Sequence, residues 1–119
     1  MADFSIYHNP RCRKSREALT LLHEEGIEPS VIEYLKETPS REDFKLLLAK
    51  LNIKTQALLR TGELIFKERF KGKEFNDDEW IDILLEYPKL IERPIVIRDN
   101  YAVIGRPIEN VKELLLKGH

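Results

Sequence analysis

The hydrophobic period of the chain changes from two residues to about 3.6 within the first 26 residues. Residues 4–8 alternate as a short strand does, and Asn9-Pro10 then interrupts the alternation. From Arg13 the apolar side chains follow a helical spacing, and Gly26 stands where a helix C-terminal cap is expected. Residues 31–35 then form a second strand signal. A strand, a helix and a strand in this order predict a βαβ unit with parallel strands, which restricts the chain to α/β folds.

The middle of the chain is predicted to be mainly helical. Ser40 and Asp43 resemble a capping pair in front of an apolar pattern with helical spacing. Residues 53–75 carry a weaker pattern and are predicted to form short helical turns and loops. Residues 76–79 offer cap candidates and first-turn carboxylates to another amphipathic helix, which Pro88 is expected to stop.

The last thirty residues return to sheet. Residues 95–97 and 101–104 are strand signals separated by a turn, which predicts a hairpin. Gly105-Arg106-Pro107 marks the start of a closing helix, with the proline at a first-turn position. The order βαβ, helical stretch, ββα predicts an α/β mixed sheet, and 119 residues fit a single domain, 1–119, with a helical insertion at about 40–91.

Charge and composition narrow the function classes. The net charge is −1, from 20 basic and 21 acidic residues, so nothing pulls the whole chain toward nucleic acid or anionic lipid. The sequence has no long apolar run and no leader-like N-terminus, so we expect a cytoplasmic protein without a membrane partner. One cysteine cannot form an internal disulfide or a thiolate metal cluster, and no metal site is predicted.

That cysteine, Cys12, lies at the predicted strand-to-helix turn among Arg11, Arg13, Lys14 and Arg16. A thiol there would face the unpaired N–H groups of the first helical turn and the positive end of the helix dipole, and both favour thiolate over thiol. The same N–H groups form an anion site beside the nucleophile. The alternative is that Cys12 is an inert buried residue.

Three neighbours also have two interpretations each. His8 either tunes the thiol or is a satisfied buried imidazole at the end of a strand. Ser15 and Arg16 are candidates for substrate binding, but Ser15 could simply help cap the helix and Arg16 could be a solvated helix residue.

Residues 8–16, HNPRCRKSR, resemble the active-site loop of the glutaredoxin-linked arsenate reductase family. The resemblance covers nearly the whole chain, and the order and spacing of its elements make it specific where a lone N-P-x-C would be weak. The further matching elements are Glu37-Thr38-Pro39, Ala57-Leu58-Leu59-Arg60, Asp77-Asp78, Leu90-Ile91-Glu92-Arg93-Pro94-Ile95-Val96 and Gly105-Arg106-Pro107.

This resemblance implies a thioredoxin-like fold with a helical insertion, Cys12 as the catalytic nucleophile, and Arg60, Arg93 and Arg106 as oxyanion ligands. It also makes Pro94 the candidate for the cis proline that faces the active cysteine in this fold. The implied substrate is arsenate, with glutathione as co-substrate and glutaredoxin as partner, and no tightly bound cofactor. We expect a monomer. Guanidinium groups match tetrahedral oxyanions better than ammonium groups do, which agrees with the implied roles.

The chain departs from the family pattern at two places. Arg13 and Lys14 follow the cysteine, where the family has small or neutral residues. Ser15 stands where related redox-sensing transcription regulators have the second cysteine of a C-x-x-C switch. Two alternatives therefore stay open: a thiol oxidoreductase of the same fold acting on a glutathione mixed disulfide or another oxyanion, and a non-catalytic regulator that binds RNA polymerase.

Overall fold

A computed structural model describes residues 3–116 of the chain. The chain forms two compact units. The first unit is built from Met1–Glu37 together with Arg93–His119, and the second from Thr38–Glu92. Among the described residues, none of the helices is both long and apolar enough to cross a lipid bilayer.

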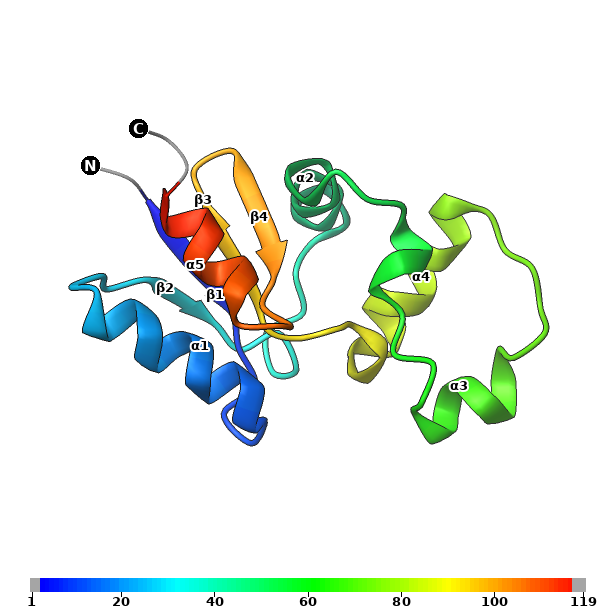
Figure 1. Ribbon diagram of the computed structural model, residues 1–119. Coiled ribbons are helices and arrows are strands. Elements are labelled where there is room, and N and C mark those ends of the chain that lie inside the picture. The colour runs from blue at the N-terminus through cyan, green and yellow to red at the C-terminus, as the bar shows by residue number, and fades with distance from the viewer. Residues whose placement is uncertain (1–2, 117–119) are drawn as a thin grey trace. The chain divides into compact units, whose positions relative to one another are not determined.

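The first unit contains a four-stranded mixed sheet with the strand order β2-β1-β3-β4 (Figure 1). β1 (Phe4–Tyr7) pairs parallel with β2 (Ser30–Ile32) and antiparallel with β3 (Ile95–Arg98). β3 pairs antiparallel with β4 (Tyr101–Ile104), which confirms the predicted hairpin. The parallel β1–β2 pair confirms the predicted βαβ unit. With the closing helix, this is the βαβ–ββα mixed sheet that the sequence pattern predicts and the thioredoxin-like fold that the resemblance implies.

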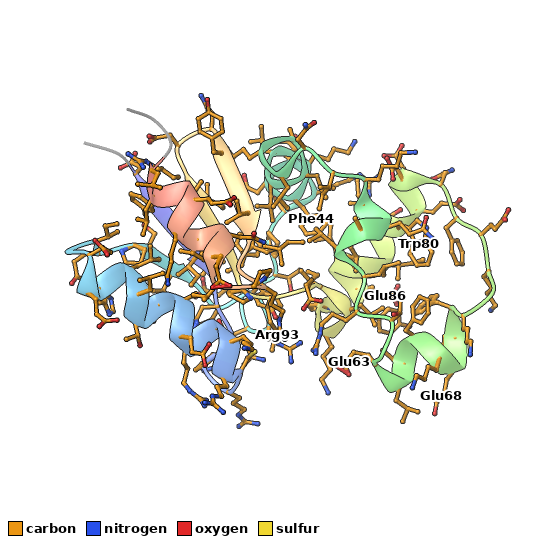
Figure 2. The ribbon with its side chains drawn as sticks, viewed as in Figure 1. Phe44, Glu63, Glu68, Trp80, Glu86 and Arg93 are labelled. Carbon is orange, nitrogen blue, oxygen red and sulfur yellow. The ribbon has the colours of Figure 1, made fainter. Side chains whose placement is uncertain are left out.

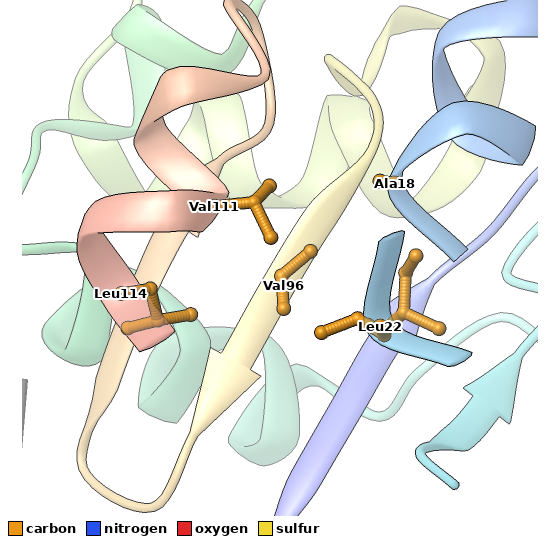
Figure 3. Packing of buried hydrophobic residues seen from close by; sticks show 6 residues of the cluster. Ala18, Leu22, Val96, Val111 and Leu114 are labelled. Atoms are coloured by element: carbon orange, nitrogen blue, oxygen red, sulfur yellow. The ribbon is translucent and has the colours of Figure 1, made fainter. Parts of the chain in front are cut away.

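Both helices of this unit, α1 (Arg13–Glu24) and α5 (Glu109–Leu116), pack on one face of the sheet. Ile6 and Val96 are register partners on β1 and β3, so their side chains point to the same face. Figure 3 shows Val96 between the side chains of α5 and those of α1. This core holds the first turn of α1 at the end of β1, where Cys12 lies. Its fully buried members are Ile6, Ala18, Leu22, Val96, Val111 and Leu114.

Gly105 follows β4 at a point where the backbone leaves no room for a side chain. A Cβ atom there would lie 2.8 Å from Cγ of Pro94 and 3.2 Å from Cγ2 of Val111. Because the proline ring is rigid, Gly105→Ala is expected to lower the free energy of unfolding by about 1–3 kcal/mol. Urea unfolding measures the loss. Gly62→Ala is the matched control, since a Cβ at Gly62 would meet nothing within 4 Å, and an equal effect of both substitutions would contradict the prediction.

The second unit is helical and contains α2 (Arg41–Leu51), η1 (Thr55–Leu58), α3 (Leu64–Arg69), α4 (Asp77–Glu86) and η2 (Pro88–Leu90). Both predicted helix starts are confirmed. Ser40 Oγ accepts the Asp43 N–H at 3.1 Å, and Asn76 forms a capping box with Glu79. Phe44 of α2 and Trp80 of α4 are buried in this unit (Figure 2). The C-terminal end of the unit pairs with the segment around Leu59, where Arg60 N–H donates to Leu90 O and Glu92 N–H donates to Leu58 O, both at 2.8 Å.

Two predicted element boundaries are wrong. The second strand ends at Ile32 instead of Leu35, because Tyr34 N–H and Lys36 N–H turn back to the carbonyls of Ile32 and Glu33. The last helix begins at Glu109, so Pro107 lies before it and not in its first turn. Both Arg93-Pro94 and Arg106-Pro107 are cis peptide bonds. The first confirms the cis bond expected at Pro94, and the second was not predicted.

Candidate active site

Cys12 is the N-cap residue of α1, at the end of a tight loop that follows β1. Asn9 shapes this loop: its side-chain Oδ1 accepts the Arg11 N–H at 3.0 Å, and its carbonyl accepts the Cys12 N–H at 2.9 Å. The Cys12 carbonyl then accepts the Arg16 N–H at 3.0 Å, which is the first bond of the helix. Helix geometry leaves the N–H groups of the next residues, 13–15, without partners inside the helix, so they are available to an anion.

The sulfur of Cys12 lies against a guanidinium group. The cysteine is only 8% exposed, and Arg106 Nη2 donates to Cys12 Sγ at 3.4 Å. Arg106 Nε donates to the carbonyl of Arg93 at 2.7 Å, which fixes the plane of the guanidinium. A positive charge therefore stands where a thiolate, or the oxygens of a group attached to the sulfur, would need it.

Further hydrogen bonds hold the two arginine-bearing segments beside one another. Gly105 N–H donates to Pro94 O at 2.8 Å, next to the Arg106–Arg93 contact. Asn110, in the first turn of α5, donates from Nδ2 to Ile104 O at 2.9 Å and to Arg106 O at 3.2 Å. The structure thus brings Cys12, the side chain of Arg106 and the backbone carbonyl of Arg93 together in the first unit. Asn110 was not among the predicted site residues, and its position four residues after Arg106 was the available signal.

His8 and Ser15 form a buried pair beneath the loop. His8 is 6% exposed and Ser15 is fully buried. Ser15 Oγ accepts the Asn9 N–H at 3.1 Å and lies 2.6 Å from His8 Nδ1. A neutral His8 with its proton on Nε2 accepts the Ser15 hydroxyl at Nδ1. The pair therefore supports the loop from inside, and this geometry does not favour the predicted role of Ser15 as a ligand of the substrate.

Burial lowers the pKa of His8 below its ordinary value of 6.5, and Arg16 acts in the same direction, while the Glu33 carboxylate opposes both. The unfolded chain therefore binds a proton at this site at a higher pH than the folded protein does. The stabilisation by neutral His8 is fully present above pH 6.5 and falls as the pH drops below that value. We expect the free energy of unfolding to decrease between pH 7.5 and 5, and His8→Asn to decrease less steeply.

Denaturant unfolding at several pH values measures the free energy of unfolding of both proteins. The other titrating groups are the same in both, so the difference between the two pH profiles reports on His8. His23→Asn, which removes an imidazole whose side chain is 48% exposed, is the control for the loss of a histidine as such. Parallel profiles for the wild type and His8→Asn would contradict the prediction.

The remaining cations of the loop have different surroundings. Arg16 is predicted to bind substrate, and its Nη1 donates to the Pro10 carbonyl at 3.0 Å, which ties α1 to the loop. Arg13 and Lys14 are exposed and pair with Glu17, at 3.3 Å and 3.9 Å.

Arg60 belongs to the second unit and is held there by two carboxylates. Its Nη1 lies 2.8 Å from Glu63 Oε1, and its Nε lies 3.5 Å from Glu92 Oε1. Glu63, labelled in Figure 2, immediately precedes α3. Sequence analysis did not predict these partners, although Glu63 is three residues from Arg60. An arginine with 23% of its side chain exposed and two edges held by carboxylates has a fixed orientation.

Two further observations concern metal ligands and hollows in the described structure. Within residues 3–116, no three side chains of His, Cys, Asp or Glu gather as a metal site would require. A shallow hollow of about 380 Å³ on the second unit is lined by residues of α3 and α4 and of the segments that follow them, and none of these residues is a cysteine or a histidine.

The fold and this site define a class: a thioredoxin-like protein with a single cysteine at the start of its first helix and an arginine against the sulfur. Comparison with known proteins gives the family. The model of the ArsC family matches residues 7–114. An arsenate reductase of Escherichia coli is 40% identical over 116 residues, which cover 97% of this chain and 82% of that protein. The chain belongs to the ArsC family.

Two further relatives add detail. The structure of an arsenate reductase from Vibrio cholerae is 45% identical and superposes with a TM-score of 0.88, covering 93% of this chain and 96% of that one. An uncharacterised protein of Escherichia coli K12, YfgD, is 41% identical over 112 residues, which cover 92% of this chain and 94% of that protein. The chain is thus similar both to proteins named for arsenate reduction and to one without a stated activity.

Proposed function

We propose that this protein is an arsenate reductase that uses the single nucleophile Cys12 and takes its reducing equivalents from glutathione and glutaredoxin. The observation that carries the proposal is the contact between Arg106 Nη2 and Cys12 Sγ at 3.4 Å, at the N-cap of α1. A guanidinium and the first N–H groups of a helix surround one sulfur, and this combination suits a nucleophile that attacks a tetrahedral oxyanion. Arsenate reductases among the relatives give arsenate as the oxyanion.

In the first step the Cys12 thiolate attacks arsenic(V). A sulfur–arsenic bond forms, and one arsenate hydroxyl takes a proton from solvent and leaves as water. Arg106 and Arg93, together with the N–H groups of residues 13–15, would hold the remaining oxygens, whose charge increases in the transition state. The expected role of Arg60 as an oxyanion ligand stays a prediction; within the second unit its guanidinium is held by Glu63 and Glu92.

Reduction then needs two electrons from thiols outside the chain, because the sequence contains one cysteine and no second thiol of its own can resolve the adduct. Glutathione attacks arsenic, and a second hydroxyl leaves as water with the proton of the glutathione thiol. A glutaredoxin thiolate next attacks the glutathione sulfur. The bond between the glutathione sulfur and arsenic breaks, and its electron pair passes to arsenic, which becomes arsenic(III). Glutathione and glutaredoxin form a mixed disulfide. Water finally displaces Cys12 and releases arsenite.

The test is arsenite formation from arsenate by the purified protein with glutathione and glutaredoxin. We expect many turnovers in the complete mixture and none when glutathione is omitted. Absence of arsenite in the complete mixture, or an unchanged rate without glutathione, would contradict the proposal.

A second candidate is a thiol oxidoreductase of the same fold with another substrate, a glutathione mixed disulfide or a different oxyanion. The exposed Arg13 and Lys14 beside the thiol favour it, because the side-chain exposure of 84% and 55% leaves both cations accessible to a larger anionic substrate. Competition between arsenate and a glutathione mixed disulfide in one assay separates the two candidates. A non-catalytic regulator is less favoured, since Ser15 is buried against His8 and provides no second thiol.

A further inference from the structure

A cavity of about 280 Å³ lies beside the loop that leads to Cys12. One wall is the loop itself, residues 8–11, and the other is the turn after β2, which contributes Glu33, Leu35 and Lys36. All of these residues belong to the first unit. The volume is close to the lower end of the range for small-molecule sites, roughly 300–1,000 Å³. The cavity therefore suits a small ligand better than a segment of another protein.

Each wall of the cavity carries a cation, and one wall also carries a carboxylate and an apolar side chain. Arg11 is exposed on the loop wall, and Lys36 on the opposite wall has 78% of its side chain exposed. Glu33, on the same wall as Lys36, adds a carboxylate whose Oε1 lies 3.7 Å from Lys36 Nζ. Leu35 is a large apolar residue that remains 40% exposed at the same place. The matching ligand has two carboxylates, one ammonium group and a short apolar part.

The position of the cavity adds a second requirement. The loop wall of the cavity ends at Arg11, the residue that directly precedes Cys12 in the sequence, so a ligand on this wall binds to the same loop that carries the sulfur. The chain has no thiol other than Cys12, and a reaction that starts at this sulfur needs a thiol from outside. Glutathione, the thiol of the proposed function, has two carboxylates and one ammonium group.

We propose that this cavity is the glutathione subsite, with Arg11 and Lys36 as the ligands of its two carboxylates and Glu33 as the ligand of its ammonium group. This assignment rests on the proposed function for the use of glutathione, but the binding itself is testable without arsenate. When Lys36 and Glu33 bind the ligand, their own ion pair is broken. This ion pair is exposed to solvent and contributes little to stability.

Binding is tested with S-methylglutathione, which carries the charges of glutathione and cannot react at sulfur. In an NMR titration of the ¹⁵N-labelled wild-type protein, we expect saturable shifts of the amide signals of residues 8–11 and 33–36. No saturable shifts up to tens of millimolar, or shifts confined to other segments, would overturn the proposal.

Two single variants and their combination test the charges. Arg11→Ala and Lys36→Ala are each expected to raise the dissociation constant about fivefold, the value of one exposed ion pair, and the double variant about 25-fold. Lys112→Ala, an exposed lysine of α5 outside the cavity, is the control and should bind as the wild type does. Dissociation constants that stay equal in all four proteins would overturn the proposal.

A change in the ligand should reproduce the change in the protein. The dimethyl ester of S-methylglutathione lacks both carboxylates, so it should bind the wild type about as weakly as the parent ligand binds the double variant. The ester should also bind the wild type and the double variant with equal dissociation constants. Tight binding of the ester would overturn the assignment of Arg11 and Lys36.

Kinetics separate this proposal from the proposed function. In the arsenate assay, Lys36→Ala should raise KM for glutathione about fivefold and leave KM for arsenate unchanged. Charge-dependent binding of S-methylglutathione without any arsenate turnover would support the subsite and refute the arsenate reaction. Arsenate turnover with the glutathione KM unaffected by Lys36→Ala would refute the subsite alone.

Discussion

Cys12→Ser is expected to lower the turnover of arsenate by at least about 10⁴-fold, because a serine hydroxyl at neutral pH is a far weaker nucleophile than a thiolate. The substitution removes the sulfur that Arg106 Nη2 contacts and changes the side chain by a single atom. It is therefore a test of chemistry more than of packing. The effect should appear in kcat, since arsenate can still bind to the arginines.

Arsenite formation with glutathione and glutaredoxin measures the loss. Thermal unfolding should show the fold of Cys12→Ser intact, and Gly62→Ala, in the second unit, serves as a control that keeps full activity. Residual turnover within tenfold of the wild type would mean that the sulfur is not the nucleophile.

The secondary structure was largely predictable, because the local signals agree with the tertiary structure. Ser40 and Asn76 cap the helices that their side chains predict, and Gly26 has the positive φ of 78° that favours glycine after a helix. The errors lie where local preference was overruled. Val31 to Leu35 is rich in strand-forming residues, but only Ser30–Ile32 pairs with β1, and the chain then turns to bury Tyr34.

The site was predictable in its residue types but not in its contacts. The position of Cys12 before a helix follows from sequence, whereas its contact with Arg106 joins residues 94 positions apart. The Ser15–His8 pair was also hidden, since a serine in the first turn of a helix usually indicates capping and here it faces inward. The carboxylates around Arg60 were missed because an arginine is commonly an exposed surface residue.

Arg106 is the second residue whose replacement should have a large effect. One guanidinium makes two contacts at once: Nε donates to Arg93 O at 2.7 Å, and Nη2 donates to Cys12 Sγ at 3.4 Å. A lysine supplies the charge as a single point and cannot maintain both contacts in one plane. Arg106→Lys should therefore behave much more like Arg106→Ala than like the wild type.

We expect kcat/KM for arsenate to fall about 10²–10³-fold in Arg106→Ala, the usual cost of removing one donor from a site that stabilises an oxyanion. Arg106→Lys should recover less than a tenth of the lost activity. The rate of alkylation of Cys12 by iodoacetamide at neutral pH should fall in both variants, because the sulfur loses its guanidinium partner. Arg69→Lys, an exposed arginine of the second unit, provides the matched substitution without effect on either readout. If Arg106→Lys were as active as the wild type, charge alone would suffice, and the fixed two-contact geometry would have no part in catalysis.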